Sequence, residues 1–146
     1  MALKDERPVD WITAPEARLV KEIVLDMISS GGGPAFAALF YERLFFYAPQ
    51  VRDWFPADLA EQNRKLISSL RILIGNLPDW ELMRETVEYL TRVHARLNLK
   101  PVHFDLFYQC MLEALESVRG SPLDDKARVP LRRAVARIGA AMMAAH

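Results

Sequence analysis

Residues 81–97 read Glu81-Leu-Met-Arg-Glu-Thr-Val-Glu-Tyr-Leu-Thr-Arg-Val-His-Ala-Arg-Leu97 and carry a histidine where a soluble helix normally has a core residue. Apolar residues recur in this stretch at steps of three and four, which predicts an amphipathic helix. The predicted buried face holds Met83, Val87, Leu90, His94 and Leu97. A buried imidazole needs a partner for its nitrogens, and a backbone carbonyl, a carboxylate and a metal all qualify. From this helix alone, a hydrogen-bonded core histidine is the simplest interpretation of His94.

The composition is that of one globular domain without a strong net charge. Of the 146 residues, 51% are hydrophobic, which is enough for a sizeable core, and 19 basic residues balance 19 acidic ones. This balance excludes the basic footprint typical of nucleic-acid binding. The longest apolar runs, at 35–40 and 140–145, are too short to span a membrane. Cys110 is the sole cysteine and the N-terminus lacks the apolar block of a secretory signal, so we expect a cytoplasmic protein.

Helix start and stop residues divide the chain into helices joined by short connections. Thr13 and Glu16 have the spacing of a capping box, and Asp58 with Glu61 repeats it. Such signals predict helices, besides the histidine-bearing one, at about 13–30, 34–47, 58–76, 101–120 and 123–145. No strand pattern is present, so the predicted class is all-α, with a polar leader over 1–12 and one domain over 13–146.

Three polar or aromatic features upstream of His94 have two interpretations each. Tyr41 lies in a helix that is apolar on nearly every side, so it is either a core tyrosine or a polar group directed into a pocket. Gln62 is either an edge residue or an amide donor to something bound. Trp54 and Phe55 form an unusually aromatic loop, which either folds back onto the core or covers a large flat ligand.

Taken in order, these elements resemble the single-domain bacterial haemoglobins and the haem domain of flavohaemoglobins. The resemblance is carried by Phe40-Tyr41-Glu-Arg-Leu-Phe45, Ala48-Pro49, the run from Val51 to Leu66, and Val93-His94. It covers the chain from about Thr13 to the C-terminus and is strongest between Phe40 and Phe104. It implies an all-α globin fold of about six to eight helices enclosing a haem pocket, with residues 13–146 as the globin domain.

The resemblance also implies roles for individual residues. His94 corresponds to the proximal ligand of haem iron, with haem b as the cofactor. Tyr41 and Gln62 correspond to the distal pair that hydrogen-bonds bound oxygen, and Phe55 to the ring packed flat on the porphyrin. The apolar cage would consist of Phe45, Leu66, Leu70, Leu90, Leu99, Phe104 and Phe107.

The chain departs from the family pattern on the proximal side. Ten residues after the proximal histidine, the family usually has a tyrosine that acts together with a glutamate in the last helix. This chain has Phe104 there and no acidic residue after Asp125, and the family's tryptophan in the last helix is replaced by Leu131 or a neighbour. Without this relay the histidine should donate less electron density to iron, which disfavours peroxidase-like chemistry.

The leading hypothesis is therefore a globin that binds oxygen reversibly, and nitric oxide and carbon monoxide as well, for transport or storage. Alternatives are nitric oxide dioxygenation, gas sensing, and a haemless interaction protein in which His94 is a core residue. No flavin or nicotinamide domain follows the globin segment, so turnover would need an external reductase. We expect a monomer or homodimer with no nucleic-acid or membrane partner.

Overall fold

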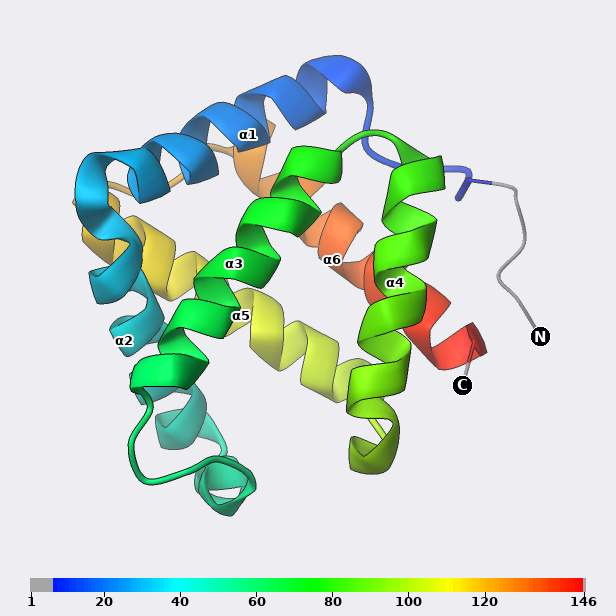
Figure 1. Cartoon of the computed structure of the whole chain (residues 1–146). Coiled ribbons are helices and arrows are strands. Elements are labelled where there is room, and N and C mark those ends of the chain that lie inside the picture. Colours follow the sequence, from blue (N-terminus) through cyan, green and yellow to red (C-terminus); the bar gives the residue numbers. More distant parts are fainter. Residues whose placement is uncertain (1–6, 146) are drawn as a thin grey trace.

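The computed structural model describes residues 7–145, and every regular element in that range is helical (Figure 1). The elements are α1 (Ala14–Met27), η1 (Ile28–Gly32), α2 (Gly33–Tyr47), η2 (Pro49–Trp54), α3 (Ala60–Asn76), α4 (Trp80–His94), η3 (Ala95–Leu97), α5 (Pro101–Arg119) and α6 (Asp125–Ala145). The predicted all-α class with six to eight helices is confirmed by six long α-helices in the described range.

One of the two predicted capping boxes forms. The Thr13 hydroxyl accepts a hydrogen bond from the Glu16 amide at 3.3 Å, and the Thr13 amide donates to the Glu16 carboxylate at 3.0 Å. The box predicted at Asp58 is wrong, because α3 begins at Ala60 and Leu59 takes the cap position without a side-chain bond. The Asp58 carboxylate instead accepts from the Ala60 amide, two residues on, at 2.9 Å.

α1 and α2 meet at a tight corner. Gly31 there has a φ of 88°, a conformation that strains any residue with a Cβ. A Cβ on Gly32 would lie 2.9 Å from the side chain of Val118, so this corner packs directly on α5. By length and composition alone, the stretch Ala14–Tyr47 would suit a membrane span. Its apolarity is also what a core helix needs, because Phe36 and other side chains along it are buried.

The core lies between two groups of helices. Figure 1 shows α3 and α4 in front of α5 and α6, with α1 across one edge. α2 packs along α5, and α6 contacts α1, α4 and α5. The largest fully buried side chains are Phe36, Ile12, Met83, Leu115, Val20, Val24, Val87 and Cys110.

The packed core begins before the predicted domain boundary at residue 13. Trp11 is 3% exposed and Ile12 is fully buried. The Trp11 indole N–H donates to the Pro78 carbonyl at 2.8 Å, and its ring meets Trp80 edge-on at 5.0 Å. Residues 1–6 of the predicted leader lie outside the described residues. The contacts of Trp11 thus pack the residues before α1 against the segment that joins α3 to α4 and against the start of α4.

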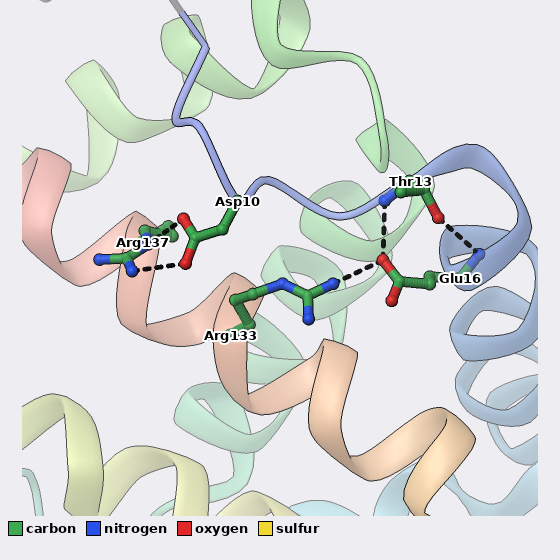
Figure 2. A network of polar contacts seen from close by, with 5 residues as sticks. All are labelled: Asp10, Thr13, Glu16, Arg133 and Arg137. Carbon is green, nitrogen blue, oxygen red and sulfur yellow. Dashed lines mark hydrogen bonds and ion pairs between the residues drawn. The ribbon is translucent and has the colours of Figure 1, made fainter.

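Two ion pairs also hold this N-terminal segment and the start of α1 on α6 (Figure 2). The Arg137 guanidinium donates to both Asp10 carboxylate oxygens, at 2.6 and 2.5 Å, and Arg133 donates to Glu16 at 2.5 Å. These hydrogen bonds are the main reason that the pKa values of Asp10 and Glu16 lie below their ordinary values. Both carboxylates are therefore charged at neutral pH.

Candidate functional site

His94 is the last residue of α4, and its ring is oriented by the backbone of the same helix. Asp79 caps the start of α4 by accepting from the amides of Glu81 and Leu82. At the other end, His94 Nδ1 lies 2.8 Å from the Leu90 carbonyl oxygen. A carbonyl oxygen can only accept, so Nδ1 carries the proton of this hydrogen bond. In the neutral imidazole with this tautomer, Nε2 carries the lone pair that can bind a metal.

The predicted buried face of α4 becomes more exposed toward His94. Met83 and Val87 are fully buried, as the sequence pattern predicted. Leu90, His94 and Leu97 on the same face are only half-buried. A cavity of about 220 Å³ adjoins His94 and is lined by Thr91, Ala95, Asn98, Leu99, Lys100, Pro101, Phe104, Met142 and Met143. The C-terminal half of α4 thus faces an open region and not the closed core.

Tyr41 on α2 and Gln62 on α3 are in direct contact. The Gln62 side-chain amide donates to the Tyr41 hydroxyl oxygen at 3.0 Å. Tyr41 is 4% exposed, and this burial raises the pKa of its hydroxyl. The hydroxyl is therefore protonated at neutral pH. Because its oxygen accepts from Gln62, its own proton is available to donate to a further group.

The aromatic loop after η2 folds back against this polar pair. The Phe55 ring centre lies 5.5 Å from that of Tyr41 and 5.5 Å from that of Phe45, with edge-to-face geometry in both cases. Tyr41 and Phe45 stack at 5.9 Å. The neighbouring Trp54 is 47% exposed and takes no part in this cluster. Of the two interpretations of the loop, packing of Phe55 onto the rest of the chain is confirmed.

α5 connects the region of Tyr41 with the region of His94. Phe107 meets Phe40 at 5.3 Å between ring centres, and Phe40 meets Tyr41 at 5.1 Å. One helical turn earlier on α5, Phe104 lines the same cavity as His94. Two neighbouring rings on one helix therefore link the polar pair and the histidine.

The other residues predicted for the pocket share one property. Each is a half-buried apolar side chain packed against the core: Phe45, Phe55, Leu66, Leu90, Leu99, Phe104 and Phe107. Leu70 differs, because it is 4% exposed and belongs to the core itself. Met142 of α6 was not predicted for the site. The residue is buried in the structure, but no local signal in the sequence indicates which cavity its face of α6 adjoins.

The donor set fits a metalloporphyrin better than a free metal ion. Among residues 7–145 there is no group of three or more His, Cys, Asp or Glu side chains that could hold a metal. One imidazole with a free Nε2 supplies a single ligand, which suits an iron whose other equatorial positions a macrocycle fills. The half-buried aromatic and aliphatic side chains offer the apolar surface that such a flat group requires.

Comparison with known proteins finds the Globin family model and relatives among globin-like proteins and flavohemoproteins. The Globin family model matches residues 38–142. An uncharacterized globin-like protein from Aquifex aeolicus is 30% identical over 86 residues, which cover 59% of this chain and 62% of that protein. Flavohemoproteins from a Burkholderia species and from Pseudomonas putida are 24% and 26% identical over 111 residues, which cover 74% of this chain but 28% of each flavohemoprotein.

A solved structure has a similar fold. A bacterial globin from Campylobacter jejuni superposes with a TM-score of 0.75 and 20% sequence identity, covering 91% of this chain and 95% of that one. At this identity the likeness concerns the fold alone.

Proposed function

The chain belongs to the globin family, and from that membership we propose that it binds haem b through His94 and binds dioxygen reversibly. When bound, haem supplies a ferrous iron that coordinates a diatomic ligand. The observation that carries the proposal is the hydrogen bond from His94 Nδ1 to the Leu90 carbonyl, because it leaves Nε2 as the ligand atom. It also fixes the ring at the end of α4, where half-buried apolar side chains gather.

We assign the distal role to Tyr41 and Gln62. A diatomic ligand with partial negative charge, held beside this pair by bound haem, would accept hydrogen bonds that are stronger than neutral ones. Tyr41 has a proton to donate, and Gln62 polarises that hydroxyl by donating to its oxygen. Burial raises the pKa of Tyr41, so the donor persists at neutral and mildly alkaline pH. Nitric oxide and carbon monoxide would bind at the same place.

The aromatic cluster would exclude water from that ligand. Phe45 and Phe55 enclose Tyr41 on two sides, and Phe107 closes the cluster through Phe40. In a dry pocket each hydrogen bond would be stronger, and water and protons would reach bound haem less readily. We place the protein in the cytoplasm, where its single cysteine would stay reduced.

Nitric oxide dioxygenation with a separate reductase is the second candidate. It is favoured by the flavohemoprotein relatives, of which this chain spans only 28%. The environment of His94 disfavours efficient oxygen chemistry. Its Nδ1 is paired with a neutral backbone carbonyl, and the neighbouring Phe104 has no hydroxyl. A carbonyl partner increases the basicity of an imidazole less than a carboxylate does. Stopped-flow mixing of the oxygenated protein with nitric oxide, with and without a reductase, separates the two functions.

Haem retention by His94 variants tests the proposal. We expect stoichiometric haem and a Soret band in the native protein and in the control variant His103→Gln, because His103 Nδ1 only caps α5 by accepting from the Lys100 amide. His94→Gly should lose the haem ligand. Added imidazole should restore the native spectrum, which a general folding defect would not allow. A native protein that takes up no hemin, or a His94→Gly variant with unchanged coordination, would contradict the proposal.

A further inference from the structure

The side chain of Arg52, in η2, is bonded to three successive backbone carbonyls. One guanidinium nitrogen donates to the carbonyls of Phe55 at 3.3 Å and Pro56 at 3.1 Å, and the other terminal nitrogen donates to Ala57 at 3.2 Å. The guanidinium carbon also lies 4.9 Å from the centre of the Phe45 ring. The loop between η2 and α3 therefore curls around a single cation.

Arg52 holds both polar groups of Phe55. The Phe55 amide donates to the Arg52 carbonyl at 3.2 Å, while the Phe55 carbonyl accepts from the Arg52 guanidinium. With its main chain fixed at both ends, Phe55 keeps its ring between Tyr41 and Phe45. Arg52 also covers the ring of Phe45, which contacts Phe55. The Arg52 side chain thus fixes the backbone of Phe55 and packs on the ring of Phe45.

Only arginine suits this arrangement. Its planar fork carries five N–H donors in fixed directions, which allows three carbonyls and an aromatic face to be engaged together. Lysine has a compact charge at one point and cannot span the three oxygens at once. Among residues 7–145 no carboxylate forms an ion pair with Arg52, so its charge serves the loop carbonyls and the ring.

We propose that Arg52 is a positioning residue. It holds the Phe55 ring against Tyr41 and Phe45 and so controls haem retention. This proposal rests on the proposed function, since it names the residue that builds one wall of the same pocket. It assigns to Arg52 no contact with haem or ligand. The whole effect of Arg52 should pass through Phe55.

The test is a double-mutant cycle read as the rate of haem loss. Haem transfer from the ferric protein to an excess of a haem-scavenging apoprotein is followed at the Soret band for the native protein, Arg52→Met, Phe55→Leu and the double variant. We expect Arg52→Met to lose haem about tenfold faster and Arg52→Lys to be nearly as fast, because the carbonyl contacts are lost in both. In the Phe55→Leu background, Arg52→Met should change the rate less than twofold. Arg18→Met, an exposed arginine on α1, is the matched control and should behave as the native protein.

A second measurement needs no haem. Hydrogen exchange of the Phe55 amide in the apoprotein should be faster in Arg52→Met than in the native chain, with no change at Met83 in the α4 core. Native rates of haem loss in both Arg52 variants, or additive effects of the Arg52 and Phe55 substitutions, would overturn the proposal while leaving the haem assignment intact. A native protein without haem affinity would overturn the proposed function, and this proposal with it.

Discussion

Replacing Gly139 with alanine tests how tightly α6 packs beside the candidate site. Gly139 is a buried position in the interior of α6. A Cβ there would lie 2.5 Å from Phe104 Cγ and 2.8 and 2.9 Å from the two Cδ atoms. These atoms belong to the root of a rigid ring, so Phe104 would have to move as a whole. Phe104 lines the cavity next to His94, and the substitution therefore presses on that cavity.

The magnitude follows from two opposing terms. Alanine is favoured over glycine inside a helix by about 0.8–1.0 kcal/mol. Inserting a methyl group into a packed core costs about 1–3 kcal/mol. We therefore expect Gly139→Ala to change the free energy of unfolding by between zero and a loss of about 2 kcal/mol. Gly75 in α3 is the matched control, because a Cβ there meets nothing within 4 Å, and Gly75→Ala should add up to about 1 kcal/mol.

Urea unfolding of the apoprotein measures both variants on one scale. Gly75 is the second-to-last residue of α3 and Gly139 is interior to α6, so their helix-propensity terms differ; the variants should differ by about 1–3 kcal/mol, with packing as the main component. Phe104→Leu removes the ring that the new methyl group would strike, so the cost of Gly139→Ala should shrink in that background. If Gly139→Ala stabilised the protein as much as Gly75→Ala does, the close packing of α6 on Phe104 would be refuted.

Three further predictions concern the distal pair, an ion pair and the cysteine. Tyr41→Phe should speed oxygen release by about ten- to one-hundred-fold and Gln62→Leu should also speed it, as measured by flash photolysis or ligand replacement; unchanged rates in both would remove the pair from the ligand's surroundings. The pKa of Glu16 is lowered chiefly by Arg133, so its stabilising effect is present at neutral pH and is lost as the pH falls below about 5; melting temperatures of Arg133→Gln should fall less steeply there than those of the native protein. Burial raises the pKa of Cys110 to about 11, so a thiol reagent at pH 8 should react with it only after denaturation, and rapid labelling of the native protein would contradict its burial.

Local patterns predicted the elements well, because their causes lie within a few residues. The capping box at Thr13 and the apolar spacing of Met83 and Val87 depend on one helical turn at a time. The capping box predicted at Asp58 was wrong, since an aspartate can bind the amide two residues on as readily as cap a helix. Trp11 was missed for a different reason: its partner, Pro78, is 67 positions away, and nothing in the polar leader indicates that contact.

For the candidate site, the sequence supplied the predicted side chains but not all of the groups that hold them in place. Tyr41 and Gln62 are 21 positions apart, and their hydrogen bond connects two residues that the resemblance had already paired. Whether they and His94 act on a haem ligand stays a prediction. The three carbonyls around Arg52 leave no trace in the sequence, because every residue has a carbonyl and only the backbone conformation directs three of them to one point.

Main-chain oxygens place both halves of the candidate pocket. The Leu90 carbonyl fixes the tautomer of His94, and the loop carbonyls fix Arg52 and thereby Phe55. Both sets lie near the end of a helical segment: Leu90 is one turn before the last residue of α4, and Phe55, Pro56 and Ala57 follow η2 directly. The geometry of the candidate pocket therefore depends in part on where α4 and η2 end, because His94 is the last residue of α4 and Phe55 follows η2. A substitution that moved either helix end by one residue would misplace His94 or Phe55 without changing the side chain itself.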